Sequence, residues 1–94
     1  MREVVYSKHL ELRLKLRSIH HELPRIIYQT SSERYTDAIT QLSVAINKTA
    51  YRGKVREVAL VYRETAKEAR LITIHPLKPG QKNSRIKSGR WKKL

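Results

Sequence analysis

Alternation of apolar and polar residues is the clearest pattern in the middle and second half of the chain. Leu42, Val44 and Ile46 alternate with Ser43 and Ala45, and a period of two is typical of a strand with one buried face. Gly53 follows, a residue that readily supplies the positive φ of a hairpin turn. We therefore expect strands over residues 33–36, 42–51, 55–62 and 70–75, with a hairpin turn at 52–54.

The first third of the chain has a less decisive pattern. Between positions 10 and 17, four leucines alternate with charged residues, which alone would indicate a strand. Every residue in this stretch is nevertheless a good helix former and none is β-branched, and Ser7 offers an N-cap oxygen. We predict a helix over 8–17, and a second short helix that is firm only from Pro24 to Gln29, since proline suits a first turn. Residues 4–6 are either a first strand or an extended lead-in.

This order, helices before an antiparallel meander, predicts an α+β fold. We expect two N-terminal helices packed on a three- to four-stranded antiparallel sheet, forming one compact domain over residues 1–80. Residues 81–94 form a basic C-terminal tail whose only sizeable apolar groups before Leu94 are Ile86 and Trp91.

The strong excess of basic over acidic residues is the sequence feature that bears most on function. The 94 residues carry 21 Lys and Arg against 8 Asp and Glu, a formal net charge of +13. The last acidic residue is Glu68, so the following segment has a field of a single sign. Such a field destabilises a compact state unless an anionic partner offsets it, and phosphate backbones are the common partner. RNA or the ribosome is the partner we expect. The alternative is a merely well-solvated basic surface.

Several classes of function find no support in the sequence. There is no Cys, the four histidines lack metal-ligand spacing, and neither a Gly-rich phosphate loop nor a nucleophile elbow is present. We therefore expect no metal and no cofactor. No apolar run reaches the ~20 residues that span a bilayer, and the N-terminus lacks a signal-peptide core. We expect no membrane association and a cytoplasmic location.

Metal-free RNA cleavage is compatible with the residues present. It needs a base for the ribose 2′-hydroxyl, an acid for the leaving 5′-oxygen and cations near the phosphorus. His75 is the best single candidate, because it ends a predicted strand and its ordinary pKa near 6.5 suits either proton role. The alternative is a strand-end histidine with no task. Tyr62 either hydrogen-bonds a phosphate or, as we favour, closes the sheet against the core.

Nucleic-acid contacts are expected at two places. Arg52 and Lys54 flank the hairpin turn, and in the tail Trp91 lies among closely spaced cations, an arrangement suited to phosphate neutralisation and base stacking. Trp91 could instead anchor the tail on the domain while the cations face outward. His9 and Arg13, an i,i+4 pair on the first helix, are secondary candidates. The cations of the tail that we assign to nucleic-acid binding are Lys82, Arg85, Lys87 and Arg90.

These segments together resemble a known group. The opening Tyr6-Ser7-Lys8-His9, the strand end Ile72-Thr73-Ile74-His75 and the closing stretch from Asn83 to Trp91 resemble a family of small prokaryotic, archaeal-type domains of unassigned function, related to the RelE/BrnT-like toxins of toxin–antitoxin systems. The resemblance implies a barnase/RelE-like fold, ribonuclease or translation-inhibiting activity, and an acidic antitoxin partner. RelE-type toxins cut RNA with Lys, Arg and Tyr. By position, the catalytic residues on the sheet would be Arg56, Tyr62, Arg70 and His75.

Two hypotheses follow, and they differ in whether the protein catalyses a reaction on RNA or only binds it. The first is an RNA-binding, toxin-like, metal-free endoribonuclease or translation inhibitor. The second is a non-enzymatic RNA-binding or ribosome-associated basic protein. A DNA-binding protein ranks lower, because no helix-turn-helix spacing is present and the first helix is rich in leucine.

Overall fold

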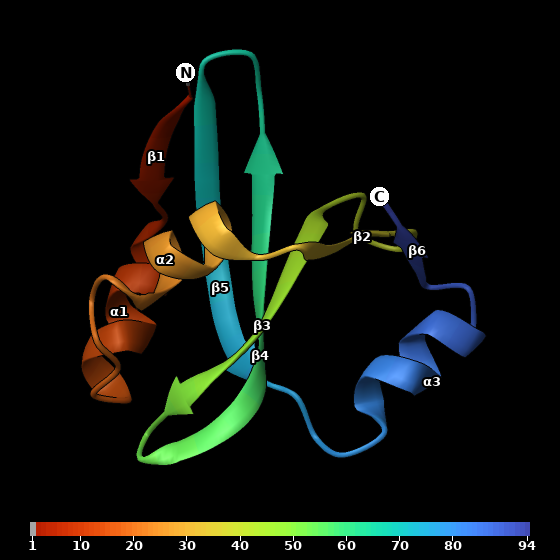
Figure 1. Ribbon diagram of the computed structural model, residues 1–94. Helices are drawn as coiled ribbons and strands as arrows, with labels where there is room; N and C mark the ends of the chain where they lie inside the picture. The colour runs from red at the N-terminus through yellow and green to blue at the C-terminus, as the bar shows by residue number, and fades with distance from the viewer. Residues whose placement is uncertain (1) are drawn as a thin grey trace.

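The computed structural model describes residues 2–94 as three helices and a six-stranded mixed sheet (Figure 1). The sheet order is β1-β5-β4-β3-β2-β6, with β1 parallel to β5 and every other neighbouring pair antiparallel. The elements are β1 (Glu3–Tyr6), α1 (Lys8–Leu16), α2 (Leu23–Thr30), β2 (Glu33–Asp37), β3 (Ser43–Tyr51), β4 (Lys54–Glu64), β5 (Glu68–Pro76), α3 (Gln81–Lys87) and β6 (Trp91–Lys93).

The expected fold, two N-terminal helices on a three- to four-stranded antiparallel sheet with a basic tail, was wrong. The sheet has six strands and is mixed, because β1 lies parallel to β5 on one edge and β6 adds to β2 on the other. Residues 81–94 contain a third helix and an edge strand. The barnase/RelE-like architecture that the resemblance implied is therefore not the fold found.

Helix α1 shows how four alternating leucines fit a helix. Leu10 and Leu14, four residues apart, are buried, whereas Leu12 and Leu16 are exposed. The helix begins at the N-cap Ser7, whose Oγ accepts the backbone N–H of Leu10 at 3.0 Å and donates to a β5 carbonyl oxygen at 2.8 Å. Since the cap also holds the helix to the sheet, the start of α1 is tied to β5.

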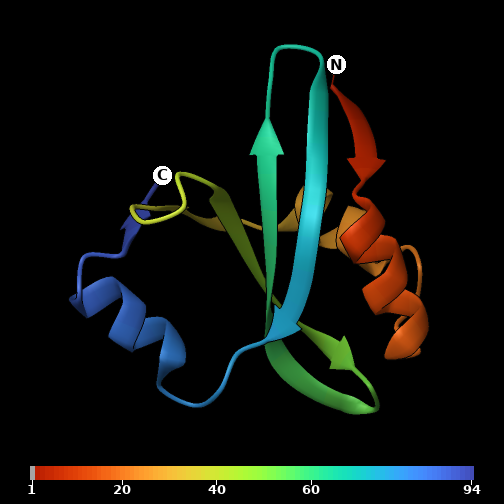
Figure 2. The ribbon, with the colours of Figure 1, turned by 180° about the vertical axis from the view of Figure 1, so that it is seen from behind.

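The two faces of the sheet carry separate cores. On one face, α1 and α2 cover a cluster that includes Leu10, Ile27, Val58, Leu60 and Tyr62. On the other, a smaller cluster is made by Tyr35, Val44, Ile46, Ala59, Leu77 and Trp91. Viewed from behind, β5 and β4 face outward with α1 on one side and α3 on the other (Figure 2). Neither helix crosses that part of the sheet.

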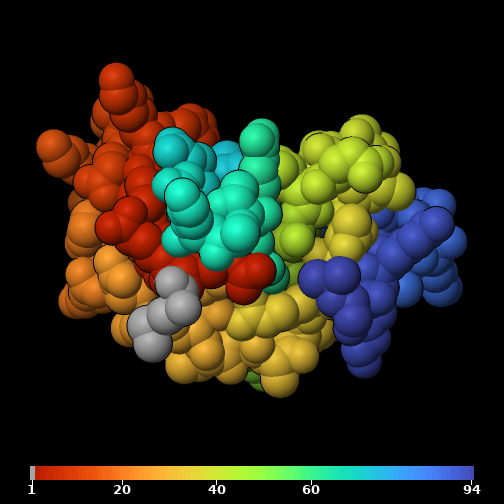
Figure 3. All heavy atoms as spheres, turned by 90° about the horizontal axis from the view of Figure 1, so that it is seen from above, coloured from red at the N-terminus to blue at the C-terminus, as the bar shows by residue number. Residues whose placement is uncertain are grey.

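Asp37 joins the C-terminal segment to the rest of the sheet. Its carboxylate accepts Trp91 Nε1 at 3.2 Å and Arg90 Nε at 3.0 Å, together with the backbone N–H groups of Ile39 and Thr40. Burial would raise the pKa of Asp37, but these donors hold it below its ordinary value. Figure 3 shows the C-terminal residues, in blue, against β2 and the loop that follows it.

Within residues 2–94, no helix combines the length and the hydropathy needed to span a bilayer.

Candidate nucleic-acid interface

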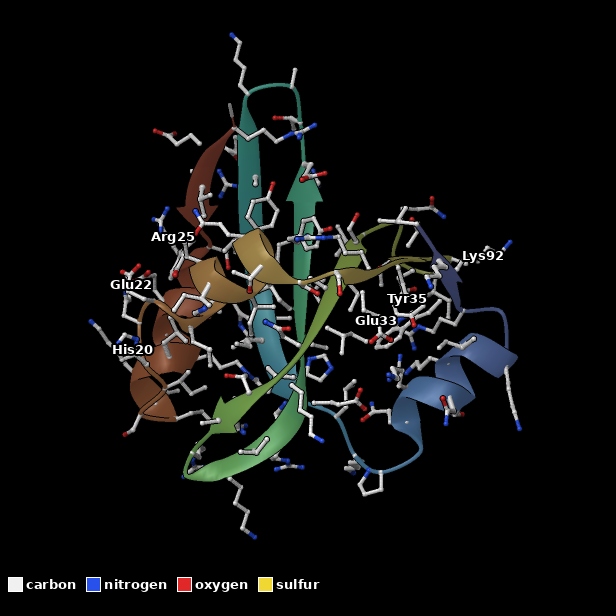
Figure 4. All side chains as sticks on the ribbon, viewed as in Figure 1. His20, Glu22, Arg25, Glu33, Tyr35 and Lys92 are labelled. Carbon is white, nitrogen blue, oxygen red and sulfur yellow. The ribbon has the colours of Figure 1, made fainter. Side chains whose placement is uncertain are left out.

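The acidic side chains are mostly engaged with particular cations or with His21. Seven of the eight carboxylates make such ion pairs within residues 2–94. Glu22 and Arg25, at the start of α2, are an example with 3.4 Å between Oε2 and Nε (Figure 4). The acids therefore neutralise only part of the cationic surface. The pairs are Arg2–Glu64, His21–Glu11, His21–Glu22, Arg25–Glu22, Arg70–Glu68, Lys82–Glu33, Lys82–Glu57 and Arg90–Asp37.

The end of the molecule with the β3–β4 hairpin is cationic. A hollow of about 350 Å³ opens between the hairpin and the C-terminal end of α1, and no acidic residue of the described part of the chain, 2–94, lines it. We call it the hairpin hollow, and its lining residues are Arg17, Tyr51, Arg52, Lys54, Arg56 and Pro76. In Figure 1 the end of α1 and the hairpin lie at the same end of the molecule.

The turn that presents these side chains has an unusual backbone. Arg52 and Gly53 have φ of 52° and 86°, so both central residues are left-handed, as in the type I′ turns that suit two-residue hairpins. Tyr51 pairs with Lys54, and Thr49 with Arg56. Alternate residues share a face, so Lys54 and Arg56 lie on the same side of the sheet as Tyr51.

The tail residues predicted from the sequence separate into engaged and exposed groups. Lys82 Nζ lies 2.8 Å from Glu57 and 3.0 Å from Glu33, and these carboxylates raise its pKa. Arg90 is held by Asp37. Trp91 is buried and stacks on Tyr35, with 5.7 Å between the ring centroids. The structure therefore gives Trp91 an anchoring position rather than one open to a base.

Other cations of α3 and β6 remain available to a ligand. Lys87, Lys92 and Lys93 are exposed and make no ion pair within residues 2–94, and we call them the C-terminal edge. Lys92 points away from the sheet, while Glu33 and Tyr35 lie inward along β2 (Figure 4). Arg85 lies over the Trp91 ring at 5.6 Å and is half-buried.

His75 lies on the sheet face that belongs to the smaller core. It pairs with Ala59 and is half-buried. Burial lowers its pKa, and the positive charges of Arg13 on α1 and Arg85 on α3 lower it further. The ring is therefore neutral at pH 7 and able to accept a proton. Arg13 is positioned by its Nε, which donates to the carbonyl oxygen of Ile74 at 2.7 Å.

The four residues proposed as catalytic are not brought together. Tyr62 is buried in the helix-covered core and its hydroxyl accepts a hydrogen bond from Arg34. Arg70 lies five positions before His75, about 16 Å along β5, where it pairs with Glu68 at 3.0 Å. Arg56 lines the hairpin hollow. Only Arg13 and Arg85, predicted for other roles, act on His75, and His9 lies exposed on α1.

Arg17 and Tyr51 line the hairpin hollow but were not among the site residues predicted from the sequence. Arg17 is the C-cap of α1 and Tyr51 is the last residue of β3. Nothing in the local pattern relates a helix end to a hairpin about 35 residues later, although the turn itself pointed to Arg52 and Lys54. Among residues 2–94, no three His, Asp or Glu side chains form a group able to hold a metal ion.

Comparisons with models of protein families, with curated proteins and with solved structures found no match to this chain.

Proposed function

We propose that this protein binds RNA through the hairpin hollow and the C-terminal edge. The observation that supports this is the distribution of charge. Seven of the eight carboxylates pair with cations or with His21 elsewhere in the molecule, whereas the cations of these two surfaces make no ion pair within residues 2–94. Phosphate groups would supply the missing negative charge, with release of counterions.

RNA is preferred to duplex DNA because of how the longest helix, α1, packs on the sheet. A groove-reading helix needs one free polar face. Helix α1 buries Leu10 and Leu14 against the sheet and exposes Leu12 and Leu16 outward, so neither of its faces suits a major groove. Cations around a hairpin turn can instead follow an irregular or single-stranded backbone.

Two variants of equal charge test the proposal. Arg52→Gln/Lys54→Gln removes two cations of the hollow, and Arg2→Gln/Arg70→Gln removes two that pair with Glu64 and Glu68. Binding of a labelled single-stranded RNA is measured by anisotropy over a series of salt concentrations. The hollow variant should flatten the log–log salt slope by about 0.7 for each phosphate that is no longer neutralised, with a smaller change in the control. Equal changes of the salt slope in the two variants would show that the hollow is not the RNA-binding surface. Absence of RNA binding by the wild type would refute the proposal.

Metal-free RNA cleavage is the second candidate. The half-buried His75 favours it, because burial and the charges of Arg13 and Arg85 lower its pKa. In this reaction His75 takes the proton of a ribose 2′-hydroxyl. The 2′-oxygen then attacks the adjacent phosphorus, and the bond to the 5′-oxygen breaks. The leaving 5′-oxygen takes a proton from solvent water and becomes a 5′-hydroxyl, and a 2′,3′-cyclic phosphate is left. The two guanidiniums stabilise the added negative charge. The toxin resemblance and an acidic antitoxin partner stay predictions.

Cleavage is tested in the presence of EDTA, which inactivates contaminating metal-dependent nucleases. Wild type should produce 2′,3′-cyclic or 3′-phosphate ends, and His75→Gln should not. His21→Gln, which alters an exposed histidine paired with Glu11, should cleave as wild type does. RNA left intact by wild type, free or on ribosomes, would leave binding as the whole function.

A further inference from the structure

The hairpin hollow has a feature that a merely cationic surface would lack. Tyr51 is only 4% exposed, and its hydroxyl is the one buried side-chain polar atom among residues 2–94 that has no hydrogen-bond partner. A buried hydroxyl left without a partner destabilises the folded state. Because the hydroxyl has almost no accessible surface, a bound ligand would offset this cost by displacing the side chains that cover it.

The remaining lining residues define the charge of such a ligand. Four cations line the hollow, and no carboxylate of residues 2–94 does; the cations are Arg17, Arg52, Lys54 and Arg56. They come from three places in the chain: the end of α1, the turn, and β4. Guanidinium groups match phosphate oxygens with paired donors. An anion of more than one charge, with several acceptor oxygens, fits this set.

A second hollow adjoins the first and has a different lining. Its volume is about 330 Å³, and it shares Tyr51 and Arg52 with the hairpin hollow. Ile19, Leu23 and Ile26 give it an apolar wall. A phosphate in the hairpin hollow would thus place an attached ring system next to apolar side chains.

We propose that the hairpin hollow binds a terminal phosphate monoester of RNA, with the end nucleoside in the adjoining apolar hollow. This rests on the proposed function and narrows it from backbone contact to recognition of a chain end. An internal phosphodiester carries one charge, whereas a monoester carries about 1.5 to 2 at pH 7 and has three free oxygens. The four cations match the higher charge and the additional free oxygen of the monoester.

The experiment compares one short RNA with a 5′-phosphate, with a 3′-phosphate and with hydroxyl groups at both ends. Wild type should bind one phosphorylated form at least about tenfold more tightly than the hydroxyl form, the effect of about one charge-assisted hydrogen bond. Arg17→Gln/Arg56→Gln should abolish this preference. Lys87→Gln/Lys92→Gln, on the C-terminal edge, should weaken binding of all three RNAs by the same factor. The preference for the phosphorylated RNA should therefore remain in this variant.

Tyr51→Phe separates recognition from folding, because it removes only the hydroxyl. It should reduce the preference for the phosphorylated end without lowering the melting temperature. Inorganic phosphate and a nucleoside 5′-monophosphate serve as competitors, and the nucleotide should compete better if the apolar hollow is used.

The outcomes for the two proposals differ. RNA binding with no preference among the three ends overturns the chain-end inference and leaves the proposed function standing. Binding of the nucleoside monophosphate, abolished in Arg17→Gln/Arg56→Gln, without binding of any RNA supports the hollow as a phosphate site and overturns RNA as its ligand.

Discussion

At the scale of single residues, the unpartnered hydroxyl of Tyr51 has a consequence for stability. The ring packs in the helix-covered core, but the hydroxyl has no hydrogen bond within residues 2–94. Removing a buried, unsatisfied polar group relieves a desolvation penalty. We expect Tyr51→Phe to raise the free energy of unfolding by about 1 kcal/mol, measured by urea denaturation without phosphate. Tyr62→Phe is the control. Its hydroxyl accepts a bond from Arg34, so that change should destabilise, and a loss of stability in Tyr51→Phe would contradict the argument.

His75 should make stability depend on pH. Its folded-state pKa is lowered, by burial first and then by Arg13 and Arg85. On acidification the unfolded chain therefore takes up the proton first, so this contribution is complete above pH about 6.5 and is lost as pH falls below that value. We expect the melting temperature of His75→Gln to fall less than that of wild type between pH 7 and pH 5.

His21 supplies the opposite control for this pH series. The hydrogen bond that His21 donates to the Glu11 carboxylate raises the pKa of His21, so its contribution is present at low pH and is lost as pH rises through the raised pKa. His21→Gln should therefore steepen the loss of stability on acidification. An identical pH profile for wild type and His75→Gln would show that His75 is not held neutral.

At the scale of elements, local patterns predicted the long elements better than the ends of the sheet. The alternation in 42–51 and 55–62 marks β3 and β4, whose pairing spans nine residue pairs across a short turn. The partner of β1 could not be predicted, because its parallel pairing with β5 joins residues about 65 positions apart. β6 has three residues, two of them lysine, so neither its period nor its composition marks a strand.

The attachment of β6 is the element whose stability is easiest to test. Asp37 is 5% exposed and holds both Arg90 and Trp91. Asp37→Asn keeps the shape but loses the charge, and we expect it to lower the free energy of unfolding by about 2 kcal/mol. Lys92→Gln on the same strand should have no measurable effect. Equal stabilities of Asp37→Asn and wild type, measured by chemical denaturation, would show that this cluster does not hold the edge.

The pairing of β6 with β2 makes truncation a poor test of the C-terminal segment. Trp91 and Asp37 pair across β2 and β6, so deletion of residues 81–94 would remove an edge strand and part of the smaller core. Loss of RNA binding in a truncated chain would then report unfolding as well as the missing charge. Point substitutions at the exposed Lys87, Lys92 and Lys93 remove the charge without unfolding the edge of the sheet, and so separate these two effects.

At the scale of the whole molecule, the sequence predicted the basic character but not where it is concentrated. The high charge after Glu68 favoured the tail as the binding region, yet Lys82 and Arg90 are engaged with acids from earlier strands. Those pairs depend on the fold of the sheet and leave no local trace in the sequence. The hairpin hollow likewise gathers Arg17 beside the turn only after α1 has packed on the sheet.

Net charge leads to a last prediction, on the salt dependence of stability. Repulsion within a chain of net charge +13 should destabilise the compact state most when screening is weak. The Debye length falls from about 30 Å at 0.01 M salt to about 10 Å at 0.1 M, while exposed ion pairs, which salt weakens, contribute about 0–1 kcal/mol each. We therefore expect the melting temperature to rise over this range of sodium chloride concentration. Arg52→Gln/Lys54→Gln should melt higher than wild type at 0.01 M and gain less from added salt, because it has two fewer like charges near the hollow. A melting temperature that falls with salt would mean that the ion pairs, rather than the unneutralised cations, dominate the electrostatics of the folded protein.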